Sequence, residues 1–201
     1  MVIERNAQQT REKILEATFD IMYQNGYQGM RVDQILQATG LAKGALYHHF
    51  KNKQALGYAV VEELLMQDIK RRWVEPLKNC DNPLAGIQQV LDNECENIPQ
   101  NMLSLGCPLN NIAQEMAGID MGFHQRIEAI YNLWSGAICQ ALTRGQQQNQ
   151  VRTNINPMTV ATFIISAMQG IIGTVKCMQD KQMLIDLKDE LAFYINTLKA
   201  P

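Results

Sequence analysis

The sequence lacks the overall positive charge that marks many proteins that bind nucleic acids. Its 201 residues hold 18 Lys and Arg against 20 Asp and Glu, for a formal net charge of −2. The charge is unevenly placed, because residues 26–53 contain four cations and one acid: Arg31, Lys43, Lys51, Lys53 and Asp33. That stretch carries +3, which leaves about −5 on the rest of the chain. An acidic remainder discourages indiscriminate DNA binding, so we expect any DNA-binding surface at one end only.

Paired cysteines are also missing. The five cysteines are an odd number with no C-x-x-C spacing, and they are Cys80, Cys95, Cys107, Cys139 and Cys177. This pattern favours reduced thiols in the cytoplasm over a disulfide scaffold or a zinc site. We expect no metal and no cofactor.

The chain shows no apolar leader and no convincing membrane span. Its polar start predicts no secretory signal, which again favours a cytoplasmic protein. The longest uncharged stretch, 153–175, is long enough to be considered as a membrane span. It contains a proline and several polar residues, however, and lacks flanking aromatic or basic belts. We therefore interpret it as a helix buried on several faces and expect no membrane association.

Catalytic constellations are absent as well. The sequence has no Ser/His/Asp motif in a suitable context, no H-E-x-x-H and no phosphate-binding loop. His124 lies beside Phe123 on a predicted helix and is more simply a structural histidine. We predict that the protein is not an enzyme.

The most informative stretch runs from Gly26 to Lys53. Its pattern predicts a short helix over Val32–Thr39, a turn at Gly40-Leu41-Ala42 and a second short helix over Lys43–Phe50. Gly40 supplies the left-handed backbone that a tight helix exit needs. This order is the helix-turn-helix pattern, whose second helix enters the major groove of DNA.

The outward face of the second helix carries groups suited to DNA. Lys43 can donate to guanine or phosphate, and the Ala45 methyl can meet a thymine methyl. Gly44 costs roughly 1 kcal/mol in a helix relative to Ala, so a packing or DNA contact is expected to compensate. We predict a DNA-binding set made of Arg31, Lys43, Gly44, Ala45, Tyr47, His48 and Lys53. The alternative is an ordinary helical hairpin with a solvated polar face.

This segment resembles the DNA-binding domain of the TetR family of bacterial transcriptional repressors. The matching residues are Gly26-Tyr27, Ile35, Ala38, Gly40-Leu41 and then Gly44-Ala45-Leu46-Tyr47-x-His49-Phe50-x-Asn52-Lys53-x-x-Leu56. The sequence departs from the family where Met30 and Arg31 replace the usual Thr or Ser, and where Asp33 stands at an often basic position. We expect Arg31 to replace the lost phosphate contact.

The rest of the chain reads as helices throughout. The resemblance implies an all-α protein of about nine helices, with a helix-turn-helix domain over 1–53 and a regulatory and dimerisation domain over 54–201. The first helix is predicted over Thr10–Asn25, with the residues before it as a short mobile arm. Further helices are predicted from Asn52 to about Val74, and over Leu84–Ile98, Pro108–Gly118, Asp120–Arg144, Pro157–Met178 and Gln182–Leu198.

The last two helices are expected to form a homodimer. Residues 160–175 are apolar almost all round, so a helix there needs cover on both sides. Family members pair these two helices with their copies. Such a dimer would place two helix-turn-helix domains, called reading heads below, on a near-palindromic operator. The predicted interface consists of Phe163, Ala167, Gly170, Leu187, Leu191, Tyr194 and Leu198.

The regulatory domain is expected to receive a signal. Family relatives enclose a small molecule, and the candidate lining residues here are Met102, Met116, Tyr131, Trp134, Phe163 and Met168. Alternatively, these residues are simply core. Cys107 precedes a predicted helix, where the helix dipole favours a reactive thiolate. Together with Lys176 it resembles the branch of N-ethylmaleimide reductase repressors that sense electrophiles and reactive chlorine through a cysteine and a lysine. Covalent and non-covalent sensing both remain open, as does a plain buried cysteine.

The sequence thus predicts a homodimeric repressor that an inducer or cysteine modification releases from DNA. The alternative is a helical dimeric ligand-binding or interaction module whose reading head no longer functions.

Overall fold

The prediction of an all-α fold is confirmed. The computed structural model describes residues 2–96, 98 and 100–201, with side chains described at 6–96, at 98 and from 103 onward. Within that part of the chain the secondary structure is helical apart from one isolated bridge between Val151 and Lys199. The chain divides into two compact units, one of residues up to Gln67 with Pro108–Glu128, the other of Asp68–Cys107 with Ala129–Pro201. The predicted boundary at residue 53 stays a prediction.

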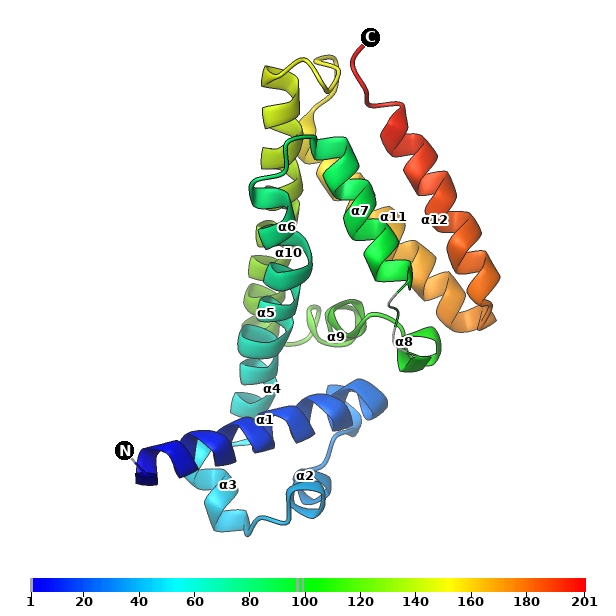
Figure 1. Ribbon diagram of the computed structural model, residues 1–201. Coiled ribbons are helices and arrows are strands. Elements are labelled where there is room, and N and C mark those ends of the chain that lie inside the picture. The colour runs from blue at the N-terminus through cyan, green and yellow to red at the C-terminus, as the bar shows by residue number, and fades with distance from the viewer. Residues whose placement is uncertain (1, 97, 99) are drawn as a thin grey trace. The chain divides into compact units, whose positions relative to one another are not determined.

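The first unit contains the reading head and two later segments of the chain. Its elements are α1 (Val2–Gly29), α2 (Val32–Thr39), α3 (Lys43–His49), α4 (Lys53–Ala59), the π-helical segment η1 (Val60–Leu65), α9 (Pro108–Met116) and the start of α10 (Met121–Gln147) (Figure 1). Fully or almost fully buried side chains form its core, and they include Ile14, Met30, Ile35, Leu46, Leu56 and Phe123.

The prediction of a mobile arm before Thr10 is wrong, because α1 already begins at Val2. Residues 2–9 are rich in helix formers such as Glu, Arg, Ala and Gln, so the helix can extend beyond its apolar stripe. Arg11 then anchors the helix to the unit. Its guanidinium donates to both Glu63 oxygens, at 2.7 and 2.5 Å, and lies 5.0 Å from the centre of the Phe50 ring.

Gly26 bends α1 near its end. The glycine has φ 72° and ψ 165°, a left-handed φ that an L side chain rarely adopts. Just beyond it, the Glu115 carboxylate of α9 accepts the backbone N–H groups of Tyr27 at 2.9 Å and Gln28 at 2.7 Å. A Cβ on Gly26 would lie 2.9 Å from the same carboxylate. The bend and the carboxylate therefore fit only around glycine, and together they position the segment that leads into α2.

The helix that follows the head is longer than predicted. Asn52 caps it as expected, with its Oδ1 accepting the Ala55 N–H at 2.8 Å. Helical structure continues beyond η1 through α5 (Met66–Ile69), the π-helical segment η2 (Lys70–Val74) and α6 (Glu75–Lys78). Each π segment shifts the faces of the residues that follow.

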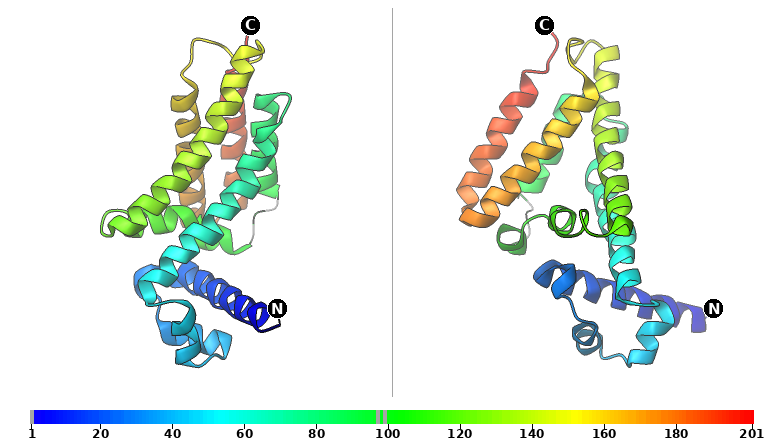
Figure 2. Two further views of the ribbon diagram at one scale, coloured as in Figure 1. Left: turned by 90° about the vertical axis from the view of Figure 1, so that its left-hand side faces the viewer. Right: turned by 180° about the vertical axis from the view of Figure 1, so that it is seen from behind.

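The second unit contains α7 (Pro83–Glu96), α8 (Gln100–Leu105), most of α10, α11 (Pro157–Met178) and α12 (Lys181–Asn196). Helices α7, α11 and α12 lie side by side, with α12 in contact with both others (Figures 1 and 2). Helix α8 was not among the helices predicted from the sequence. Asn156 caps α11 and Asp180 caps α12, because Asn156 accepts the Thr159 N–H at 3.0 Å and Asp180 accepts the Gln182 N–H at 2.8 Å.

Helix α11 is the one helix in the described part of the chain that is long and apolar enough to cross a membrane. It packs instead along α12 and against α8, and its Ile164, Ile165 and Met168 side chains are buried. These contacts agree with its interpretation as a core helix.

Candidate functional site

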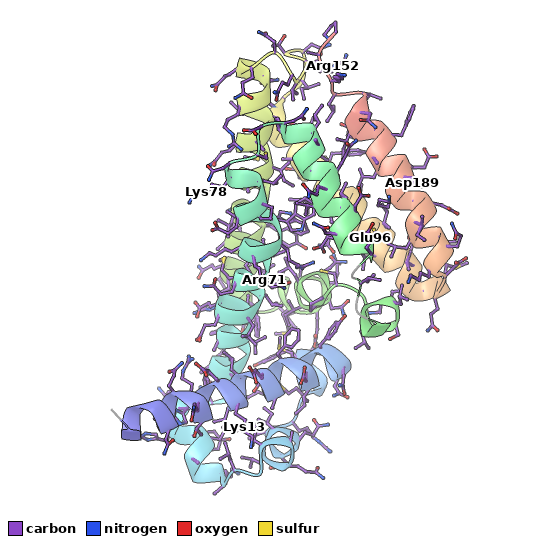
Figure 3. All side chains as sticks on the ribbon, viewed as in Figure 1. Lys13, Arg71, Lys78, Glu96, Arg152 and Asp189 are labelled. Carbon is purple, nitrogen blue, oxygen red and sulfur yellow. The ribbon has the colours of Figure 1, made fainter. Side chains whose placement is uncertain are left out.

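The helix-turn-helix has the geometry that the sequence predicts. Gly40 adopts φ 67° and ψ 17°, and its N–H donates to the Leu36 carbonyl at 2.8 Å, which ends α2 in a left-handed cap. Lys13 of α1 donates to the Thr39 carbonyl at 2.8 Å (Figure 3). Leu46 is fully buried, so the inward face of α3 is fixed by apolar packing and its other face is left to solvent.

The outward face of α3 agrees with the predicted set. Lys43, Gly44, Tyr47 and His48 are exposed, and Ala45 is partly exposed. The Tyr47 side chain is 40% exposed, which is unusual for a large apolar ring in this unit. Arg31 precedes α2 with an exposed side chain, and its backbone N–H donates to the Gln34 Oε1 at 2.9 Å.

Lys53 differs from the other predicted residues. It is only partly exposed, its Nζ donates to the Gln28 carbonyl at 3.1 Å, and it lies 4.9 Å from the centre of the Tyr27 ring. Lys53 thus also holds the bent end of α1, and a mutation there would disturb the head as well as remove a cation.

The His49 imidazole is harder to protonate than a free histidine. Partial burial lowers the pKa of its imidazole below the usual value, and the nearby charges of His48 and Arg11 lower it further. The His48 and His49 rings meet edge to face at 5.3 Å.

Gly44 has no structural reason to be glycine within its own chain. It lies in regular helix, and a Cβ placed on it would meet no atom within 4 Å. Packing within the chain therefore does not compensate for its helix penalty. The α3 backbone at Gly44 is therefore open to close approach by an external molecule.

Cys107 lies in the second unit and is 5% exposed. Helix α9 begins at Pro108, so the predicted position just before a helix is confirmed. Its Sγ accepts from the Gln169 Nε2 of α11 at 3.6 Å, and the charged group of Arg72 is near enough to interact with it. Lys176 is partly buried further along α11, and its proximity to Cys107 stays a prediction.

The predicted pocket residues do not all belong to one unit. The Met102 side chain lies outside the described residues, and Met116 is buried in the first unit. In the second unit Trp134 and Met168 are buried, and the Trp134 ring lies 5.3 Å from Trp73 and 6.3 Å from Tyr131. Burial raises the pKa of Tyr131 to about 12, so it remains a neutral phenol.

Several polar residues of this core were missed from the sequence. Arg72 is largely buried, with Asp68 at 2.6 Å on one side and the Glu94 carboxylate on the other. The spacing of four between Asp68 and Arg72 was the available signal.

The predicted dimer surface is only partly free. Phe163 is 50% exposed and meets Tyr194 edge to face at 4.9 Å, and Gly170 is open. Leu191 and Leu198 are buried within the chain, while Ala167 and Leu187 are intermediate. Phe193, at 69% exposed, and Ile185, at 37%, add to the apolar surface and were not predicted.

Comparison with known proteins covers both parts of the chain. A family model described as bacterial regulatory proteins, tetR family, matches residues 14–60, and one described as tetracyclin repressor-like, C-terminal domain, matches residues 83–189. The HTH-type transcriptional repressor DhaR of Mycobacterium sp. (strain GP1) is 25% identical over 182 residues, which cover 87% of this chain and 86% of DhaR.

Solved structures agree over nearly the whole length. A TetR transcriptional regulator from Chloroflexus aurantiacus J-10-FL is 25% identical, with a TM-score of 0.86 and 98% of each chain covered. The reduced form of NemR from E. coli has a TM-score of 0.81 at 20% identity, covering 96% of this chain and 97% of that one. At this identity the likeness to NemR is one of fold, and the electrophile-sensing branch stays a prediction.

The open space around Gly44 leads to a test with two readouts. We expect Gly44→Ala to raise the free energy of unfolding by up to about 1 kcal/mol, because alanine favours the helix. We expect the same methyl group to weaken binding to a duplex that the wild-type protein selects from random sequences. Urea denaturation followed by circular dichroism measures the first effect, and fluorescence anisotropy measures the second.

Gly40→Ala is the matched control for the stability measurement. Gly40 has a φ of 67°, which strains an alanine, so this variant should lower the free energy of unfolding. If Gly44→Ala binds the selected duplex as tightly as wild type, then Gly44 is not a position of close approach.

Proposed function

Because the chain belongs to the TetR family, and so is a DNA-binding transcriptional regulator rather than an enzyme, we propose that it acts as a cytoplasmic homodimeric repressor. In this proposal, two copies of α3 bind successive major grooves of a near-palindromic operator. A small-molecule inducer or modification of a cysteine releases the dimer from DNA. The observation that carries the proposal is the exposed polar face of α3, with a glycine that its own fold does not require.

The residues of that face have separate roles. Lys43 and Ala45 are proposed to contact base edges, and Tyr47 and Arg31 to contact phosphates, which set register without reading sequence. His48 offers a further polar ring. Lys53 has a double role, since its contact with the end of α1 supports the same head that its charge helps to bind.

Dimerisation is proposed through α11 and α12. The exposed Phe163, Ile185 and Phe193 leave these helices with apolar surface that water covers poorly. The open backbone at Gly170 and Gly173 allows another helix to approach closely. Large exposed side chains beside small residues make a surface suited to helix packing against a second copy.

The repressor is favoured over the alternative of a module with a non-functional head. The head retains its buried core, its left-handed cap and an exposed cation on α3. A relative whose name describes a repressor, DhaR, matches the chain along most of its length.

The first test removes two contacts from α3. We expect Lys43→Ala/Tyr47→Ala to weaken binding to the selected palindromic duplex by at least about tenfold, because each contact removed contributes a kcal/mol or more. The slope of log affinity against log salt should fall by about one for the lost lysine. Fluorescence anisotropy at several salt concentrations measures both, with Lys78→Ala, an exposed lysine of the second unit, as control.

Unchanged affinity in the double variant, or failure of the wild-type protein to select any duplex, would instead support the module with a non-functional head.

The second test concerns the dimer. We expect Phe163→Glu to give a monomer in sedimentation velocity, because it places a charge in the proposed apolar interface. Ile119→Glu changes a residue that is 65% exposed outside α11 and α12, and this control should remain dimeric. A dimeric Phe163→Glu protein, or a monomeric wild type, would contradict the proposed interface.

The third test separates covalent from non-covalent sensing. Cys177 is exposed and would react first, so the comparison is made in a Cys177→Ser background. If Cys107 is the trigger, N-ethylmaleimide should release the Cys177→Ser protein from DNA, whereas the protein that also carries Cys107→Ser should stay bound. Full release of the double variant would eliminate Cys107, and no release of either protein would favour a non-covalent inducer.

A further inference from the structure

The second unit contains an apolar pocket whose lining includes Met168, one of the lining residues predicted from the sequence. It lies between α7, α11 and α12, and its hollow of about 400 Å³ is partly open to solvent. Its walls are mostly aliphatic, with Leu91 from α7, Ile171 from α11 and Leu184 from α12. The polar or ionisable side chains along it are those of Glu94, Cys95 and Lys188.

Lys188 is already engaged by its neighbours. Its Nζ lies 2.9 Å from the Asp92 carboxylate and 2.7 Å from that of Asp189, which Figure 3 places on α12. These two carboxylates raise the pKa of the Lys188 ammonium, so it stays charged but has two acids around it. It is therefore a poor binding site for an anionic ligand.

Glu94 shares its cationic partner with another acid. Its carboxylate pairs with Arg72, but Arg72 also pairs with Asp68 at 2.6 Å, and the exposed Arg71 lies 2.8 Å from Asp68. Burial raises the pKa of Glu94 above its usual value, and the charge of Asp68 adds to the effect.

Carboxylates outnumber cations in the ion pairs that involve Glu94 and Lys188 and their partners. These pairs join four carboxylates, Asp68, Asp92, Asp189 and Glu94, to three cations, Arg71, Arg72 and Lys188. The excess negative charge lies next to an apolar surface. A ligand that combines a cationic head with an apolar body complements both features.

We propose that this pocket binds a hydrophobic cation, with its charged head at Glu94 and its apolar body between α7, α11 and α12. Binding of the cation does not depend on the proposed function. A role of the cation as the inducer does rest on the proposed function, so release from DNA is measured separately from binding of the cation.

The test compares three probes that share one body and differ in their head. They are 4-phenylbutylamine, which is a cation at neutral pH, 4-phenylbutan-1-ol, which is neutral, and 4-phenylbutanoate, which is an anion. Isothermal titration calorimetry on the full-length protein should show the cation binding at least about tenfold more tightly than the alcohol, since a hydrogen bond to a charged group is the stronger kind. The anion should bind most weakly.

Glu94→Gln tests the origin of that preference. Glutamine keeps the size of the side chain and can still accept from Arg72, so we expect the cation to lose its advantage while the alcohol binds as before. Glu96→Gln is the matched control, because Glu96 is an exposed carboxylate at the end of the same helix (Figure 3). It should leave the preference unchanged.

Ile171→Trp provides a second, independent variant. A large side chain in the pocket wall should weaken all three probes together, which locates the site even if Glu94→Gln folds poorly. Failure of wild type to prefer the cation, or an unchanged preference in Glu94→Gln, overturns the proposed site. Either result leaves the repressor proposal intact, because anisotropy of the selected duplex tests DNA binding without any probe.

Discussion

The Glu115 carboxylate at the bend of α1 is the interaction on which the reading head depends most. It pairs with two backbone N–H groups directly after Gly26, where the left-handed turn leaves them without helical partners. Removing such a partner from a backbone amide costs about 1–3 kcal/mol when the amide is shielded from water. The residues that follow lead into α2, so this contact between α9 and α1 positions the whole helix-turn-helix.

A second contact supports the same region from α4. Lys53 donates to the Gln28 carbonyl and lies over the Tyr27 ring, while Asn52 caps the helix on which Lys53 stands. The start of α10 is tied to α4 as well, since Asp120 accepts the Tyr58 hydroxyl at 2.7 Å. Segments far apart in the sequence thus join in one unit with the helix-turn-helix.

The second unit departs from a simple apolar core. Its interior contains Arg72 between two carboxylates, and a thiol in contact with an amide. Buried charges contribute less to stability than their pairing suggests, because desolvation offsets much of the attraction. Their presence beside an apolar pocket is more readily understood as a means to select ligands by charge, which is the role we propose for Glu94.

The sequence by itself determined the helical fold, the position of α2, Gly40 and α3, and the cap at Asn52. These features depend on short-range patterns, namely apolar spacing, left-handed glycine and side chains that accept from nearby N–H groups. Only the tertiary structure decided that Lys53 binds the end of α1, that Arg72 is buried and that Leu191 and Leu198 face their own chain. It also revealed the carboxylate of Glu115 at Gly26, 89 positions earlier in the chain. Such contacts join residues distant in sequence, and a single sequence contains no local pattern that pairs them.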